Sequence, residues 1–232
     1  VKLGALNDLR PVLTTCETRE VSTMKRLFVF SVLLLTLLGC DDGGEEDLVL
    51  REGLYYKKSS QVPFTGKTMG NPQTTFRHGK MHGPYVEYDF WGRISDKGTY
   101  KNGKREGPWV GYHENGQVWW EGTFKNGKKE GPSVEYWDNG QISDKGTYKN
   151  GKEEGPWVDY DENGQLSSKG TFKDGKREGH WVEYYQYHDN GQLSSKGNYK
   201  NGKKEGPWVD YNKDGTVDKE WTGTYRNGEL VK

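Results

Sequence analysis

The chain has only two cysteines, Cys16 and Cys40, no surplus of charge of either sign, and a small share of hydrophobic residues. No cysteine follows Cys40, so the part of the chain beyond it must fold without a disulfide. The 34 basic side chains are balanced by 34 acidic ones, which argues against nucleic acid as a partner, because neutralising many phosphates takes a basic surplus. Hydrophobic residues make up 31% and aromatic residues 13%. That composition is too polar for one large globular core and too aromatic for a disordered chain.

Glycine, in contrast, is abundant and recurs in a repeated pattern. The stretch YKNGKREGPW at 100–109 returns, slightly changed, at 124–133, 148–157, 172–181 and 199–208. Glycines that follow Asn, Asp or a similar turn residue are spaced alternately by 13 and 11 residues, with two exceptions, so the full period is 24. These glycines are residues 79, 92, 103, 116, 127, 140, 151, 164, 175, 191, 202, 215 and 228.

The repeated turns predict a fold made of β-hairpins. Asn-Gly and Asp-Gly are the strongest short hairpin signals, since both turn residues must tolerate positive φ. The segments between turns are too short for helices with loops, and they are rich in Trp, Tyr, Val, Phe and Thr, as strands require. The sequence therefore predicts an all-β fold, an elongated single-layer antiparallel meander of tandem hairpin repeats of about 24 residues.

One hairpin shows what the recurring glycine does. If Asn115-Gly116 is a two-residue turn, Trp109 pairs with Gly122 across the hairpin. By the same rule Trp157 pairs with Gly170, and Trp208 occupies the same place in a later repeat. A glycine opposite a large ring leaves room for the ring. We therefore interpret these tryptophans and glycines as structural parts of the repeat.

The energies explain why the unit is repeated. One repeat buries about three large apolar side chains, each worth about 1.5–3 kcal/mol. Ordering its backbone costs at least about 1 kcal/mol per residue. A lone repeat therefore cannot fold, and each must share strand hydrogen bonds and ring contacts with its neighbours.

The segment MKRLFVFSVLLLTLLGC, which starts at Met24, predicts an export signal. A basic head precedes an apolar run at 27–38, and a helix of that length rises only about 18 Å, short of a hydrocarbon core of about 30 Å. Its last four residues, LLGC, resemble a bacterial lipobox, which implies acylation of Cys40 and cleavage before it. Such acyl chains would anchor a soluble domain to a membrane. The alternative is an ordinary signal peptide with an incidental cysteine.

The chain thus divides into five predicted segments, and we expect the first to precede the true start of the protein at Met24. The segments are the over-extended N-terminus at 1–23, a lipoprotein signal peptide at 24–39, the lipidated cysteine and an acidic tether at 40–53, a degenerate first repeat at 54–75, and the repeat domain at 76–232. We expect export and anchoring to a bacterial membrane, and the sequence leaves open which membrane of the envelope.

The repeat G-P-W-V-x-Y-x-x-N-G-Q-L-x-x-x-G-x-Y-K-x-G-K-x-x-G resembles the variant MORN repeat over roughly residues 76–228. This repeat is found in bacterial proteins labelled the YwqK-type antitoxin family. The resemblance implies a scaffold that binds a protein, with a toxin as the partner if the antitoxin label applies. MORN arrays serve varied scaffolding roles, so the resemblance implies a fold more than an activity.

No residues in the sequence form a recognisable catalytic or metal-binding set. A catalytic residue is usually singular, whereas the carboxylates here are iterated, and we interpret the repeated Glu as solvated beside the turn lysines. The run Asp210–Gly215 begins like an EF-hand loop, but Trp221 stands where the bidentate Glu should be. We therefore expect no enzyme activity, no metal and no cofactor. The repeated Glu residues are Glu106, Glu130, Glu154, Glu178 and Glu205.

The pair Trp119-Trp120 departs from the polar residues of sister repeats. Trp120 should lie across the next hairpin from Ser133, which replaces the anchor Trp in its unit, so we interpret Trp120 as a structural compensation. Trp119 is expected on the other face, opposite Tyr112. An exposed pair of this kind suits a binding hot spot, and plain cross-strand packing is the alternative.

The insertion Tyr185-Gln186-Tyr187 is the second departure, and it lengthens one repeat from 24 to 27 residues. We predict Tyr185 and Tyr187 as further partner-binding residues, with a longer loop of no role as the alternative. An open sheet offers broad faces and edges, which suit protein recognition better than small substrates. A glycan- or cell-wall-binding module, in which repeat aromatics form cages, is the alternative function.

Overall fold

The computed structural model describes residues 48–186 and 191–231, and every regular element in these ranges is a β-strand. No helix in the described ranges is long and apolar enough to cross a membrane. The strands are β1 (Leu48–Arg51), β2 (Leu54–Lys57), β3 (Gly66–Thr68), β4 (Gln73–Arg77), β5 (Lys80–Tyr88), β6 (Ile94–Lys101), β7 (Lys104–Arg105), β8 (Gly107–Tyr112), β9 (Val118–Lys125), β10 (Lys128–Tyr136), β11 (Ile142–Lys149), β12 (Lys152–Glu153), β13 (Gly155–Tyr160), β14 (Leu166–Lys173), β15 (Lys176–Tyr184), β16 (Leu193–Lys200), β17 (Lys203–Asp210), β18 (Gly223–Arg226) and β19 (Glu229–Val231).

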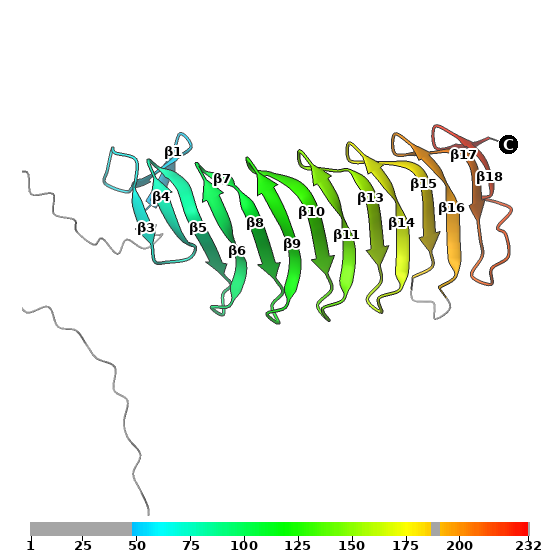
Figure 1. Ribbon diagram of the computed structural model, residues 1–232, viewed down its shortest axis with the longest axis horizontal. Helices are drawn as coiled ribbons and strands as arrows, with labels where there is room; N and C mark the ends of the chain where they lie inside the picture. Colours follow the sequence, from blue (N-terminus) through cyan, green and yellow to red (C-terminus); the bar gives the residue numbers. More distant parts are fainter. Residues whose placement is uncertain (1–47, 187–190, 232) are drawn as a thin grey trace, which may run out of the picture. The chain divides into compact units, whose positions relative to one another are not determined.

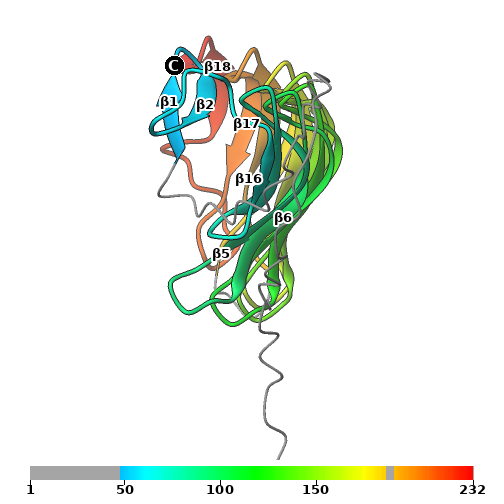
Figure 2. The same cartoon turned by 90° about the vertical axis from the view of Figure 1, so that its left-hand side faces the viewer.

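From β3 onward the strands form one antiparallel sheet in chain order (Figure 1). The pairs β6–β7 and β6–β8 show that β7 and β8 are two parts of one kinked strand, and β12 and β13 repeat this arrangement. Among the described residues no register joins β19 back to β3, so the sheet is open. Figure 2, which looks along the row of strands, shows a single curved layer. The predicted single-layer meander of antiparallel hairpins is confirmed.

A small hairpin of β1 and β2 adjoins the first edge of this sheet. Leu48 pairs with Lys57 and Arg51 with Leu54. The Tyr55 amide donates to the Gly79 carbonyl at 2.8 Å, which ties the hairpin to the turn after β4. The sequence assigned residues 48–51 to the tether. They belong instead to the folded part, because they form strand β1, which pairs with β2.

Two kinds of hairpin turn alternate along the chain. At Asn102-Gly103 both residues have positive φ, 52° and 79°, as a two-residue turn requires. At the other kind only the glycine does, for example Gly116 at 82°, and the His113 amide donates to the Gln117 carbonyl at 2.8 Å. The prediction of a two-residue turn at Asn115-Gly116 is wrong, because this turn is longer and is followed by a bulge.

The bulge shifts the register only next to the turn. Trp109 pairs with Gly122, as predicted, and Trp157 pairs with Gly170. Between Gly111 and Tyr112 the register shifts by one residue. Tyr112 consequently pairs with Val118, and the predicted pairing of Tyr112 with Trp119 is wrong.

The buried core is a row of aromatic rings on one face of the sheet. Trp109, Trp181 and Trp208 are fully buried. The ring of Trp109 lies over Gly98 of the preceding hairpin, where a Cβ would sit 2.2 Å from the indole. The glycine that accommodates the ring is thus one hairpin earlier than its strand partner Gly122, so each repeat packs against the one before it.

Ser133 replaces the anchor Trp in one hairpin, and Trp120 fills the core beside it. Trp120 is buried and joins Trp109 and Phe124 in one cluster, with the Trp120 and Phe124 ring centroids 6.0 Å apart. The predicted pairing of Trp120 with Ser133 is wrong, because the register shifts between Lys129 and Ser133: Trp120 pairs with Glu135, and Ser133 pairs with Gly122. This geometry supports the interpretation of Trp120 as a structural compensation.

Candidate functional site

The sheet has two faces of different chemistry, because side chains alternate along each strand. One face, here called the aromatic face, carries the buried tryptophans together with half-buried carboxylates. The opposite face, here called the lysine face, carries valines, exposed prolines and lysines, as Pro108, Val110 and Lys97 show. The balanced net charge of the chain therefore hides a separation of charge between the two faces.

On the aromatic face several of the rings are already covered by cations of the chain itself. The Arg105 guanidinium lies 4.1 Å from the Trp109 ring centroid, and Arg177 lies 4.4 Å from that of Trp181. Neighbouring rings meet edge to face, as Tyr100 and Trp109 do at 5.2 Å. In the described part of the chain these aromatics are thus packed against one another, and they form no vacant cage.

Carboxylates line the same face two residues after most anchor positions, Gly111 after Trp109 being the exception. Lys129 pairs with Glu135 at 3.5 Å, and Lys204 pairs with Asp210 at 3.5 Å. Burial raises the pKa of Asp210, although Lys204 opposes the rise. Burial, with the nearby Glu135 carboxylate, raises the pKa of Asp144 to about 6. Both ion pairs lie within one strand, Lys129–Glu135 in β10 and Lys204–Asp210 in β17.

Trp119 occupies the bulge and turns to the same face as Trp120. A Cβ at Gly111 would sit 2.3 Å from the Trp119 indole nitrogen and 2.2 Å from that of Trp120. The ring centroids of Trp119 and Trp120 are 5.6 Å apart. Trp120 is buried, whereas Trp119 is 38% exposed. The prediction that Trp119 lies on the opposite face is wrong, because a bulge residue does not follow the strand alternation.

The other predicted partner-binding residues lie elsewhere. Tyr112 is half-buried on the lysine face, with the Lys97 ammonium 5.0 Å from its ring centroid. Tyr185 is half-buried, and its hydroxyl donates to the Tyr211 carbonyl at 2.6 Å, a bond that links two repeats. Tyr187 and Cys40 lie outside the described residues. The structure therefore does not bring Trp119, Tyr112 and Tyr185 into one site.

The sequence reasoning missed an exposed aromatic pair at the turn after β5. Phe90 is 92% exposed and Trp91 73% exposed, and their ring centroids are 5.2 Å apart. The Asp89 carboxylate fixes the turn by accepting from the amides of Trp91 and Arg93. The signal was present, because the corresponding turn residues in a sister repeat are Glu114 and Asn115.

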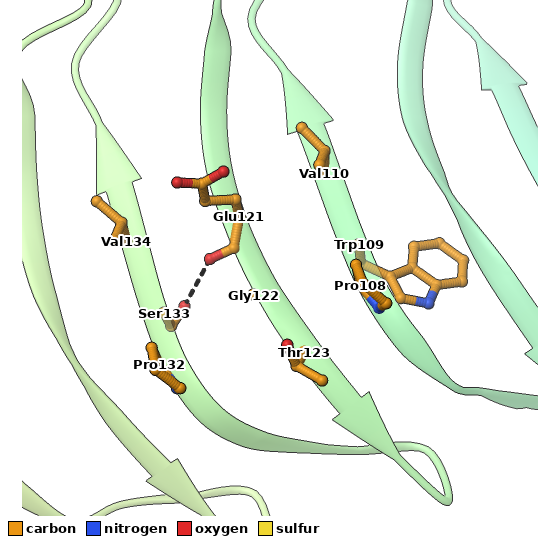
Figure 3. A pocket seen from close by; sticks show the side chains of 9 residues that line it. All are labelled: Pro108, Trp109, Val110, Glu121, Gly122, Thr123, Pro132, Ser133 and Val134. Carbon is orange, nitrogen blue, oxygen red and sulfur yellow. Dashed lines mark hydrogen bonds between the residues drawn. The ribbon is translucent and has the colours of Figure 1, made fainter.

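A shallow hollow of about 240 Å³ lies on the lysine face over Gly122, between the strands that carry Val110 and Val134. Figure 3 shows its lining on three neighbouring strands, and the Ser133 hydroxyl donates to the Glu121 carbonyl at 3.2 Å. By strand alternation Pro108, Val110, Pro132 and Val134 share the lysine face. The hollow is large enough for one apolar side chain and too open for a buried small-molecule site.

The family comparison agrees with this geometry. The model of the MORN repeat variant matches residues 105–126, 129–150, 153–174 and 177–201, and that of the MORN repeat matches residues 75–84, 97–108, 169–180 and 196–207. The chain is a MORN-repeat protein. Each variant MORN match starts just after one tight turn and reaches the next. The first and third matches include the kinked strands of β7 with β8 and of β12 with β13. None of the curated proteins compared with the chain matches it.

Proposed function

We propose that this MORN-repeat protein is a membrane-anchored envelope lipoprotein whose sheet binds a protein partner. The anchor rests on the export-signal pattern at 24–39 and the lipobox-like sequence that ends at Cys40. The binding role rests on a single-layer sheet that leaves broad surface on both sides. Resemblance to the YwqK-type antitoxin family supports a toxin as the partner, and with it a role in immunity.

The observation that best supports protein binding is the exposed edge of Trp119. Its ring is held by Trp120 and by the bare backbone of Gly111, so an aromatic side chain is presented in a fixed position. Rigid, partly exposed tryptophans are typical anchors of protein interfaces. Phe90 and Trp91, at the turn one hairpin earlier, enlarge the apolar surface in this part of the sheet.

Crosslinked capture from the native membrane tests the binding role. Trp119→Ala should lower partner recovery at least about tenfold, as loss of a hot-spot residue does, while the circular dichroism stays unchanged. Trp221→Ala is the matched control, because Trp221 is also exposed but lies near the far end of the sheet. Equal recovery with wild type and Trp119→Ala would remove Trp119 from the interface, and unfolding of that variant would assign Trp119 to structure.

Metabolic labelling with palmitate tests the anchor separately. Cys40→Ala should abolish the label and leave an unprocessed or released protein. Label that persists in this variant contradicts the lipoprotein proposal without affecting the binding proposal.

A wall- or glycan-binding role has weaker support. The repeat indoles such as Trp109 and Trp181 are 1% and 0% exposed, so a sugar ring could not stack on them without opening the sheet. Sedimentation of the chain with purified cell wall, lost in Trp91→Ala, would favour that role through the exposed aromatic residues instead.

A further inference from the structure

The lysine face carries a row of single lysines, one for each hairpin, that runs across the strands. Lys97 lies between Val86 and Val110 on its two neighbouring strands, and Lys145, Lys169 and Lys196 lie between valines in the same way. Glu121 occupies this position in one hairpin. The row therefore reads cation, anion and then three cations along the sheet.

The ammonium groups of this row are positioned but not neutralised. Lys97, Lys145 and Lys196 lie 5.0, 5.5 and 5.7 Å from the ring centroids of Tyr112, Tyr160 and Tyr211. Within the described ranges none of the four lysines of the row has a carboxylate within 4.0 Å. A tyrosine ring holds a lysine side chain near the sheet without cancelling its charge, so the cations remain available to a partner.

A second row on the same face places like charges directly opposite each other. At five of the tight turns the flanking lysines are cross-strand partners, for example Lys101 with Lys104. Directly opposed like charges destabilise a sheet, yet the arrangement recurs in successive hairpins. In the described part of the chain only Lys152 among these lysines has an ion pair, with Asp174 at 4.0 Å. The other opposed pairs are Lys125–Lys128, Lys149–Lys152, Lys173–Lys176 and Lys200–Lys203.

We propose that the lysine face binds an acidic protein segment in the polyproline II conformation, with carboxylates at every third residue. The proposal goes beyond the proposed function, because it concerns the face opposite to that of Trp119 and specifies the chemistry of a protein segment that this face binds. The repeated cations supply the charge complementarity, and the Pro and Val side chains between them supply apolar contact.

The spacing of the row selects the conformation of the partner. Successive lysines are two strands apart, about 9.6 Å, because neighbouring strands lie about 4.8 Å apart. Three residues of polyproline II span about 9.3 Å and return to the same side of that helix. Residues on one side of an extended strand repeat at about 6.8 Å, and two turns of an α-helix span about 10.8 Å. Polyproline II fits the row over its whole length with the smallest mismatch.

The interruption at Glu121 favours a protein over a uniform anionic surface. A membrane of anionic lipid or a phosphate polymer would be repelled at this point and gain nothing from it. The hollow of about 240 Å³ between Val110 and Val134 adjoins Glu121, and it can receive an apolar side chain. The expected segment thus has an apolar residue in place of its second carboxylate.

Calorimetric titration of the full chain in detergent, at low salt, tests this inference with defined peptides. The probe consists of Glu-Pro-Pro triplets, one for each of Lys97, Glu121, Lys145, Lys169 and Lys196, with Leu in place of the second Glu. The control peptide keeps the same order of Glu and Leu residues but has one extra Pro per repeat unit, which breaks the three-residue spacing. The triplet probe should bind about tenfold more tightly than the control, as several exposed ion pairs acting together predict.

The double variant Lys145→Glu/Lys169→Glu should lose this preference. Lys213→Glu/Lys219→Glu is its matched control, because it makes the same charge change on exposed lysines away from the row, and it should keep the preference. Equal binding of both peptides, or an unchanged preference in the first double variant, overturns the inference. Glu121→Lys separates the partner classes, because it should strengthen binding of phosphatidylglycerol vesicles and leave the Leu-containing probe unchanged or weaker.

A vesicle affinity that exceeds the peptide affinity and rises in Glu121→Lys would assign the face to lipid and overturn the inference. The proposed function is tested separately, through Trp119 and Cys40. Its failure can therefore be told apart from failure of the present inference. Loss of capture in Trp119→Ala with no spacing preference among the peptides would leave the protein-binding scaffold in place and remove only the acidic segment.

Discussion

Glu153 occupies a position where other repeats place a cation on the aromatic face. Arg105, Lys129, Arg177 and Lys204 hold the corresponding sites, and each covers an aromatic ring. Beside Glu153 the Trp157 indole N–H donates to the Asp159 carboxylate at 3.0 Å. In other repeats the indole N–H donates to a backbone carbonyl: Trp109 to Thr99, Trp181 to Thr171 and Trp208 to Asn198. In the repeat that lacks the cation, the Trp157 indole thus has a different hydrogen-bond acceptor from the indoles of the other repeats.

Asp144 is the cross-strand partner of Asp159, so the lack of a cation at position 153 affects Asp144 as well. Burial first, and then Glu135 and Asp159, raise its pKa from the ordinary 3.8 to about 6, while Ser143 and Lys129 oppose the rise. A raised carboxyl pKa means that the folded state binds the proton more tightly than the unfolded state does. The contribution of Asp144 to stability therefore increases as the pH falls through about 6 and is lost as the pH rises through this value.

The first prediction restores the missing cation. Glu153→Lys should pair with Asp159, as Lys129 pairs with Glu135, and lower the pKa of Asp144. An ion pair of up to about 1 kcal/mol should raise the Tm at pH 7 by about 2–4 °C. The gain should shrink between pH 7 and pH 5, where Asp144 takes up its proton, and thermal unfolding across this range measures it. Glu162→Lys makes the same charge change in an exposed turn and should raise the Tm by less; equal effects of the two variants would contradict the mechanism.

Residue positions were predictable from the sequence where strand alternation holds and not where it breaks. The pairing of Trp109 with Gly122 follows from the turn spacing alone. Trp119 does not, because the bulge beside it adds one residue and turns its ring to the face of Trp120. Phe90 and Trp91 were visible as a departure from the repeat, but their exposure depends on how the turn after β5 closes.

At the scale of the element, each tight turn is attached to the preceding repeat by two backbone amides. The Asn150 amide donates to the Glu130 carboxylate at 2.7 Å, and the Gly151 amide donates to the Lys129 carbonyl at 2.9 Å. The same carboxylate contact recurs at Glu106, Glu154, Glu178 and Glu205. The prediction that these glutamates are merely solvated is wrong, because the positive φ of both turn residues directs their amides toward the neighbouring repeat.

The second prediction removes one such contact. Glu130→Ala leaves the Asn150 amide to solvent and should lower the free energy of unfolding by about 1 kcal/mol, since the bond has a charged acceptor but is exposed. Glu130→Gln keeps an acceptor and should lose less. Urea denaturation measures the loss, and hydrogen exchange at the Asn150 amide locates it. Glu162→Ala removes a carboxylate from the other kind of turn and serves as the control; a loss as large as that of Glu130→Ala would show that general charge, not the contact, is responsible.

The hairpin as a unit was predictable because its signals are local. Asn-Gly turns and aromatic strands require only neighbouring residues to be recognised. The kink that divides β7 from β8, and the attachment of each turn to the preceding repeat, depend on contacts between hairpins. No single repeat contains that information, so the sequence indicated the strands and their order but not how the repeats are joined.

At the scale of the whole described sheet, most of the buried hydrophobic residues form two clusters, with Phe76 and Trp157 outside both. Tyr85, Trp109, Trp120 and Phe124 make the first, and Trp181, Trp208 and Tyr225 make the second. In the described ranges no ring contact joins Trp120 or Phe124 to Tyr148, the next ring along the sheet. The Lys129 ammonium bridges this gap, at 5.4 Å from the Trp120 ring centroid and 4.7 Å from that of Tyr148. The hairpin with Ser133 is thus the weakest connection between the two clusters.

The third prediction follows from this division. In a repeat sheet each hairpin contacts only its neighbours, so stability is a sum of local and nearest-neighbour contributions. Trp181→Ala removes a fully buried indole and should cost about 3–5 kcal/mol. Because the connection at Ser133 is weak, hydrogen exchange should accelerate in β14–β17 far more than in β5–β9. The exposed Trp221→Ala, as a control, should leave both regions close to wild type. If protection fell equally in both regions, the sheet would unfold as one cooperative unit, and the cation bridge of Lys129 would have to couple the two clusters as strongly as the ring contacts do within each.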